Sequence, residues 1–88
     1  MTLALPREVI LTETESGVVL LNERDGRFWR LNGSGATALR LLLEGRTPRE
    51  AAEELSAAGP QFLERATADV HGLIDALRSA GLLVAEAP

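Results

Sequence analysis

The chain has 88 residues, no cysteine, one histidine and a formal net charge of −4, and all nine of its basic residues are arginines. This length predicts one domain at most, spanning 1–88 with its core at about 8–84. The absence of cysteine excludes disulfides and thiolate metal sites, and one histidine leaves a zinc site short of ligands. We therefore expect neither a metal nor another cofactor. The acidic charge argues against nucleic acid as a partner, and because no stretch has the length of a membrane span and Met1–Glu8 lacks a signal-peptide pattern, we expect a cytoplasmic protein with no membrane partner.

Three stretches rich in β-branched or aromatic residues predict the strands of an antiparallel sheet. The first two cover residues 8–13 and 17–23, with a turn at 16–17 between them. Gly26 then suits the left-handed position of a three-residue hairpin loop, and the third strand follows at 27–31.

The three-residue loop also predicts the register of the second and third strands. Leu21 is expected opposite Trp29, and Val19 opposite Leu31. Because directly opposed residues share a face of the sheet, these four side chains should form one apolar face. The opposite face should carry Phe28 and Arg30.

Capped, leucine-rich stretches predict three helices after the sheet. The first starts at the N-cap residue Asn32 and ends at Gly45. The second has a capping box with proline at its first position in 47–50 and should end at Gly59. Its buried side is expected to hold Ala51, Ala52, Leu55 and Ala58. The third should run from about Pro60 or Phe62 to Ala80, with Gly81 after it and a short docked tail.

This order of elements predicts an α+β domain. Three antiparallel strands followed by three helices favour a winged helix-turn-helix-like fold, with the sheet as the wing. The third strand lies at an edge of the sheet if the strands pair in sequence order.

Few residues offer catalytic chemistry, so we expect no enzymatic activity. His71 and Asp75 have the spacing of a hydrogen-bonded pair on a helix, but no serine or cysteine nucleophile lies near them in sequence, which favours a solvated helix face. Residues 32–35 resemble a phosphate-binding loop at a helix N-terminus. They lack the lysine and the spacing of a P-loop, which favours a flexible cap.

A DNA-binding role fits the predicted shape but not the charge. The third helix would enter the major groove, and its charged residues are Glu64, Arg65, Asp69, Asp75 and Arg78. Three acids against two arginines would not hold a phosphate backbone. An acidic winged-helix regulator stays as an alternative.

Binding of another polypeptide suits the predicted sheet edge better. A free edge accepts an extended peptide as one more strand, given a groove beside it. On the third helix, one stripe combines Arg65 and Asp69 with the small residues Gly72 and Ala76. Mid-helix glycine costs about 0.5–1 kcal/mol relative to alanine, so Gly72 either lets a peptide approach closely or allows tight packing against the rest of the domain. The sequence favours neither explanation.

Several motifs, in this order, resemble one known family. The hairpin ends in an aromatic pair before Leu31 and Asn32, the first helix ends in 44–47 (EGRT), and the chain closes with Leu77 and 81–83 (GLL). Over nearly the whole chain, VVLLNERDGRFWRLNGSGATALRLLLEGRTPREAAEEL and ADVHGLIDALRSAGLL resemble the PqqD family. Its members are small peptide-modification chaperones, also called RiPP recognition elements.

The resemblance implies binding of the leader segment of a ribosomally made precursor peptide. In this family the leader adds as a strand beside the third strand and lies against the third helix. Carried onto this sequence, that implies contacts with Arg27, Phe28, Trp29, Arg30, Leu31, Arg65, Ala66, Asp69, Gly72, Leu73 and Ala76.

The resemblance also implies a partner enzyme. A free-standing domain of this length is most similar to the B1 proteins of lasso-peptide biosynthesis, which deliver the precursor to a leader peptidase. A chaperone for a radical-SAM peptide-modifying enzyme is the alternative. The open edge and the outward Phe28 further predict a capacity to form a homodimer when no peptide is bound.

Overall fold

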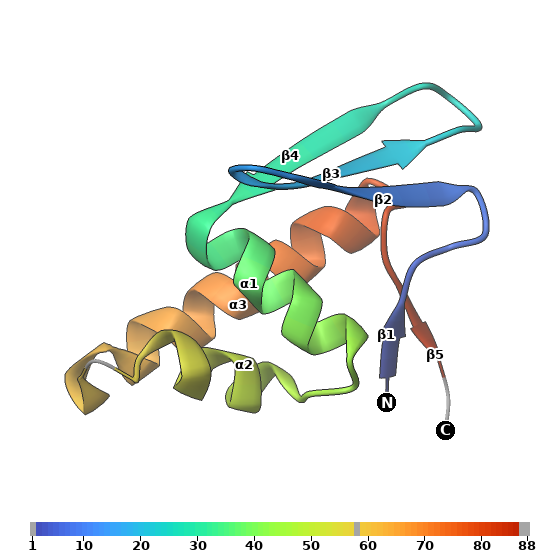
Figure 1. Ribbon diagram of the computed structural model, residues 1–88. Helices are drawn as coiled ribbons and strands as arrows, with labels where there is room; N and C mark the ends of the chain where they lie inside the picture. The colour runs from blue at the N-terminus through green and yellow to red at the C-terminus, as the bar shows by residue number, and fades with distance from the viewer. Residues whose placement is uncertain (1, 58, 87–88) are drawn as a thin grey trace.

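The computed structural model describes residues 2–57 and 59–86. The chain has an α+β fold in which a three-stranded antiparallel sheet covers a group of helices, as predicted (Figure 1). The strands of this sheet lie side by side in sequence order and are β2 (Val9–Thr14), β3 (Gly17–Asn22) and β4 (Phe28–Asn32). The helices are α1 (Gly33–Leu43), α2 (Pro48–Leu55), the short 3-10 helix η1 (Pro60–Phe62) and α3 (Leu63–Ser79). Strand β4 therefore lies at an edge of the sheet.

A second, two-stranded sheet was not predicted. Strand β1 (Thr2–Ala4) pairs antiparallel with β5 (Val84–Glu86), which brings the two ends of the chain side by side (Figure 1). Leu3 is buried and belongs to the main core, so this sheet anchors the N-terminal segment. The predicted docked tail is thus a strand.

The predicted register of β3 and β4 is wrong by one residue. Leu20, not Leu21, lies opposite Trp29, and Val18, not Val19, lies opposite Leu31. Consequently Val18 and Leu20 are buried, whereas Val19 and Leu21 point outward. The predicted faces of the third strand are nevertheless confirmed, because its inner side chains pack on the core and its outer ones, Phe28 and Arg30, are exposed.

The register differs because the hairpin loop has four residues rather than three. The N–H of Asn22 donates to the carbonyl of Arg27 at 2.8 Å, which leaves residues 23–26 in the loop. The Asn22 side-chain oxygen also accepts from the N–H of Arg24 at 2.9 Å, a local turn that lengthens the connection. Gly26 has a φ of +75°, the left-handed conformation predicted for it. The first turn is also displaced, because Thr14 pairs with Gly17 and the turn is 15–16.

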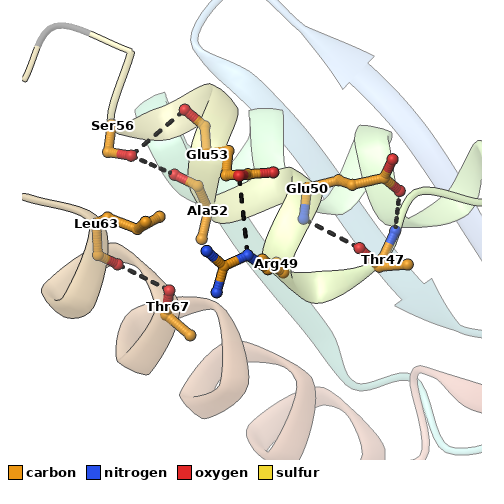
Figure 2. A network of polar contacts seen from close by, with 8 residues as sticks. All are labelled: Thr47, Arg49, Glu50, Ala52, Glu53, Ser56, Leu63 and Thr67. Carbon is orange, nitrogen blue, oxygen red and sulfur yellow. Dashed lines mark hydrogen bonds and ion pairs between the residues drawn. The ribbon is translucent and has the colours of Figure 1, made fainter. Parts of the chain in front are cut away.

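The predicted capping box of α2 is confirmed (Figure 2). The N–H of Glu50 donates to Thr47 Oγ1 at 3.0 Å, and the N–H of Thr47 donates to Glu50 Oε1 at 2.8 Å. The predicted end at Gly59 is wrong, because α2 stops at Leu55. Ser56 Oγ donates to the carbonyls of Ala52 and Glu53, and this local bonding favours the end of the helix. Ala58 lies outside the described residues.

The other two helices end as predicted. In α1 the N–H groups of Gly45 and Arg46 donate to the carbonyls of Leu42 and Leu41, the pattern of a Schellman motif. Gly81 and Leu82 repeat this pattern at the end of α3. Asn32 occupies the predicted N-cap position of α1, but its side chain makes no capping hydrogen bond.

One core joins the sheet to the helices. It is made of leucines, valines, isoleucine and alanines from every layer, and the largest fully buried side chains are Leu20, Leu39, Leu42, Leu77, Leu82, Leu83, Val18 and Val70. Within residues 2–57 and 59–86, no helix combines the length and apolar character needed to cross a bilayer.

Candidate functional site

The outer edge of β4 is open. In the described part of the chain β4 pairs only with β3 and leads directly into α1 through Gly33, whose φ is +52°. A backbone edge without a neighbouring strand offers N–H and C=O groups to any extended chain of suitable shape. The geometry of β4 therefore permits strand addition.

Apolar side chains of the core extend to this edge. Trp29 and Leu31 are half-buried and pack against the core cluster from its rim. Their remaining exposed surface lies beside the open backbone, on the helix side of the sheet. An added strand would meet apolar surface at every second position there.

A small hollow continues this surface onto the helices. It has a volume of about 70 Å³ and lies where α1, α2 and α3 meet, lined by Ser34, Gly35, Ala38, Leu55, Asp69, Val70 and Leu73. A Cβ on Gly35 would stand 3.8 Å from Cδ2 of Leu31, so the first turn of α1 joins the hollow to β4. We call the surface formed by Trp29, Leu31, Gly35, Asp69 and Leu73 the edge surface.

The structure brings only some of the predicted site residues to this surface. Asp69 and Leu73 line the hollow, and Ala66 and Ala76 are half-buried on the same helix. Arg65 is exposed on α3, and Arg27 is exposed in the loop that precedes β4. The predicted set is thus divided between β4 with the residue before it and α3, and only Trp29, Leu31, Asp69 and Leu73 of it belong to the edge surface.

Gly72 is exposed, and a Cβ built on it would meet no atom within 4 Å. One of the two explanations for a mid-helix glycine, tight packing against the rest of the domain, is therefore wrong. Open space above Gly72 remains compatible with the approach of another chain.

The charges near the edge surface form no ion pair with any residue that the structure describes. Among the described residues, ion pairs join Arg40 to Glu13 and Arg49 to Glu53, at 2.8 and 3.8 Å. Neither pair involves Asp69 or Arg65, although these two residues are four apart on α3. The Asp69 carboxylate beside the apolar hollow is thus available to a ligand.

Five residues of the hollow were not predicted as site residues: Ser34, Gly35, Ala38, Leu55 and Val70. The run interpreted as a flexible cap of the helix is 32–35 (NGSG), and it includes Ser34 and Gly35. Its small side chains are what leaves the hollow open between α1 and α3. The small residues at the start of a leucine-rich helix were the only sequence signal for Ser34 and Gly35, and the other residues had none.

The rest of the described surface shows no catalytic arrangement. Among the described residues, His71 and Asp75 are not joined by a hydrogen bond, and no three side chains of His, Cys, Asp or Glu are grouped so that they could hold a metal ion. A shallow hollow of about 690 Å³ lies on the other flank of α3, against α2, and Arg49, Glu64 and His71 are in its lining. Its mixed charges do not assemble into a nucleophile and a base.

The sequence matches the family described as Coenzyme PQQ synthesis protein D (PqqD) over residues 17–83. Among curated proteins, no significant match was found.

Two solved structures are similar to this chain over at least 97% of its length. "Lasso peptide synthetase B1 complexed with the leader peptide" has a TM-score of 0.88 and 28% identity, and the similarity covers 97% of this chain and all of the other. "TbiB1 in Complex with the TbiA(beta) Leader Peptide" has a TM-score of 0.82 and 25% identity, with both chains covered completely. Both of these proteins were therefore solved with a leader peptide bound.

Proposed function

This chain belongs to the PqqD family and is a PqqD-like RiPP recognition element, and we propose that it binds the leader segment of a ribosomally made precursor peptide. One observation carries the proposal: a lasso peptide synthetase B1 protein and TbiB1, both solved with a leader peptide bound, share its fold over at least 97% of the chain. The open edge of β4 and the apolar edge surface beside it are the features that such a ligand requires.

The proposed binding mode is strand addition. The leader lies antiparallel or parallel to β4, with backbone hydrogen bonds to its open edge, and its inward side chains contact Trp29, Leu31 and the hollow next to Asp69. Backbone pairing supplies affinity that depends little on sequence, whereas the hollow selects side chains. A volume of about 70 Å³ limits the hollow to part of one apolar side chain.

The proposed role is positional rather than catalytic. By holding the leader, the domain raises the local concentration of the core peptide at a partner enzyme, and the gain depends on the length of the connecting segment. The exposed Phe28 on the other face of the sheet is a suitable contact for that enzyme. We favour a leader peptidase of lasso-peptide biosynthesis as the partner, because one of the two structural relatives is a lasso peptide synthetase B1 protein with a leader peptide bound.

The experiment is a titration with a synthetic leader peptide of the cognate precursor, followed by fluorescence anisotropy. We expect saturable binding at micromolar concentrations or tighter and no binding to a random DNA duplex. A chain that binds the duplex and not the leader would instead be the acidic winged-helix regulator. Adding a candidate leader peptidase or a radical-SAM enzyme to the leader complex then identifies the partner by co-elution in size-exclusion chromatography.

A further inference from the structure

The outer face of the three-stranded sheet is organised in cross-strand rows. Ile10, Leu21 and Phe28 form one row, since each lies directly opposite the next. The adjacent row consists of Thr12, Val19 and Arg30. Arg30 is therefore the one charged side chain in these two rows, and it stands on the strand with the open edge.

The position of Arg30 on this face is supported by Phe28. Its guanidinium carbon lies 5.9 Å from the centroid of the Phe28 ring, within the range of a cation–π contact. Its neighbour on β3 is the apolar Val19, and no carboxylate of the described residues lies within 4 Å of it. Within residues 2–57 and 59–86, the Arg30 charge at the edge thus has no anionic partner.

The surroundings of Arg30 contain hydrogen-bond donors and no acid. A hollow of about 340 Å³ lies beside it, lined by Thr14, Ser16, Val18, Val19, Leu31 and Asn32 in addition to Arg30. Two hydroxyls and one amide face the same space as the guanidinium, which suits a carboxylate.

Strand β2, at the opposite edge of the sheet, carries no arginine. Strand β2 carries Glu13, which makes a bidentate pair with Arg40 at 2.8 and 3.2 Å. Two further acids, Glu8 and Glu15, flank that strand. Because Glu13 is neutralised by Arg40 and β2 itself carries no arginine, an extended peptide with carboxylates finds a cation on the strand at β4 and none at β2.

We propose that the peptide strand accepted along β4 carries a carboxylate at the outward-facing position beside Arg30, and that this contact directs the peptide to this edge and sets its register. The inference rests on the proposed function, because it needs a strand at β4. It specifies a sequence pattern for the bound peptide. One acidic residue faces outward, and the two residues adjacent to it are apolar and face Trp29 and Leu31. Directly opposed unlike charges stabilise a strand pair modestly, so replacing the acid should weaken binding about two- to fivefold.

The test uses a random library of linear twelve-residue peptides displayed on phage. It is selected in parallel on the unmodified chain, on Arg30→Glu and on Arg7→Glu, which makes the same charge change at an exposed site before β2. We expect the unmodified chain and Arg7→Glu to enrich Asp or Glu between two apolar residues, and Arg30→Glu to enrich Lys or Arg there. One enriched peptide, synthesised with Glu or Lys at that position, should bind the two chains with opposite preference.

The outcomes separate this inference from the proposed function. Enriched peptides without the acidic position, or the same preference on Arg30→Glu, overturn the inference and leave leader binding intact. If the unmodified chain enriches no peptide, both fail. Arg30→Gln, which removes the charge without reversing it, replaces Arg30→Glu if circular dichroism shows that the latter does not fold.

Discussion

The backbone of Gly17 lies against the carbonyl group of Leu31 across the β3–β4 ladder, so closely that a Cβ on Gly17 would overlap that oxygen and stand 2.8 Å from Cα of Asn32. Both atoms belong to the backbone of the edge strand and cannot turn aside as a flexible side chain would. The absence of a side chain at position 17 thus determines how near β4 lies to β3, and with it the position of the open edge.

Gly17→Ala should therefore destabilise the fold by about 1–3 kcal/mol, the cost of overpacking a site that cannot relax. The measurement is urea denaturation followed by circular dichroism. Leader affinity should fall as well, because β4 must shift to admit the methyl group. A loss of less than about 0.5 kcal/mol, the usual range of neutral surface changes, would show that the ladder is looser than the structure indicates.

Gly72 should respond in the opposite way to the same substitution. Because a Cβ there meets no atom within 4 Å, Gly72→Ala should stabilise the chain by about 0.5–1 kcal/mol, the gain in helix propensity. Gly72→Leu should also fold, but its side chain would occupy the space through which a leader approaches α3, and leader affinity should fall at least about tenfold, roughly 1.4 kcal/mol. Denaturation and anisotropy titration measure the two effects.

The matched control for Gly72→Leu is Ala68→Leu, an exposed position on the flank of α3 that faces α2. It adds bulk to the same helix without approaching the edge surface and should leave leader affinity unchanged. Asp69→Arg tests the same region by charge. If Gly72→Leu and Asp69→Arg both leave leader affinity unchanged, this part of α3 does not belong to the binding site.

Local signals in the sequence were sufficient to predict the helices. Thr47 and Glu50 form reciprocal hydrogen bonds between side chain and backbone within one helical turn. Gly45 and Gly81 end their helices through backbone hydrogen bonds to the preceding turn. None of these features depends on distant residues. The one wrong helix end, at Ser56, is also local, since its hydroxyl bonds to carbonyls that the preceding turn presents.

Features that depend on distant contacts were not predictable in the same way. The pairing of Leu20 with Trp29 depends on one additional loop residue, and a slip of one residue exchanges the faces of a strand. The pairing of β1 with β5 joins segments from opposite ends of the chain, each only three residues long. The hollow likewise arises from three helices, and its residues Gly35 and Leu55 have no sequence pattern in common. Predicting the open edge required only the order of the strands.

The ion pair between Glu13 and Arg40 should make stability depend on pH. Its hydrogen bond from Arg40 lowers the pKa of the Glu13 carboxyl below the ordinary value of 4.5. A lowered folded-state pKa means that the pair stabilises the chain above about pH 4.5 and that this contribution is lost as the pH falls through the folded-state pKa. Glu13→Gln should therefore lower stability near pH 7 and make little difference near pH 3.

Urea denaturation of the unmodified chain and of Glu13→Gln at several pH values measures this difference in stability. Glu50 also has a lowered pKa, through its hydrogen bond from the backbone of Thr47, and titrates in both chains. The difference between the unmodified chain and Glu13→Gln therefore gives the contribution of Glu13 to the pH dependence of stability. High salt should reduce the difference, since both side chains of the pair are exposed. A difference that does not change between pH 7 and pH 3 would contradict the assignment.

Phe28→Ser should separate leader binding from delivery to the partner enzyme. The Phe28 side chain is 58% exposed on the outer face, away from the edge surface, so its loss should change stability by less than about 1 kcal/mol. Leader affinity should stay within about threefold, or roughly 0.7 kcal/mol. Removal of the leader by the partner peptidase should slow markedly if this face holds the enzyme, because aromatic anchors dominate the energy of such contacts. Phe62→Ser is the matched control, since Phe62 is 54% exposed on η1 at a distance from the sheet, and equal rates for the two variants would exclude the outer sheet face as the docking surface.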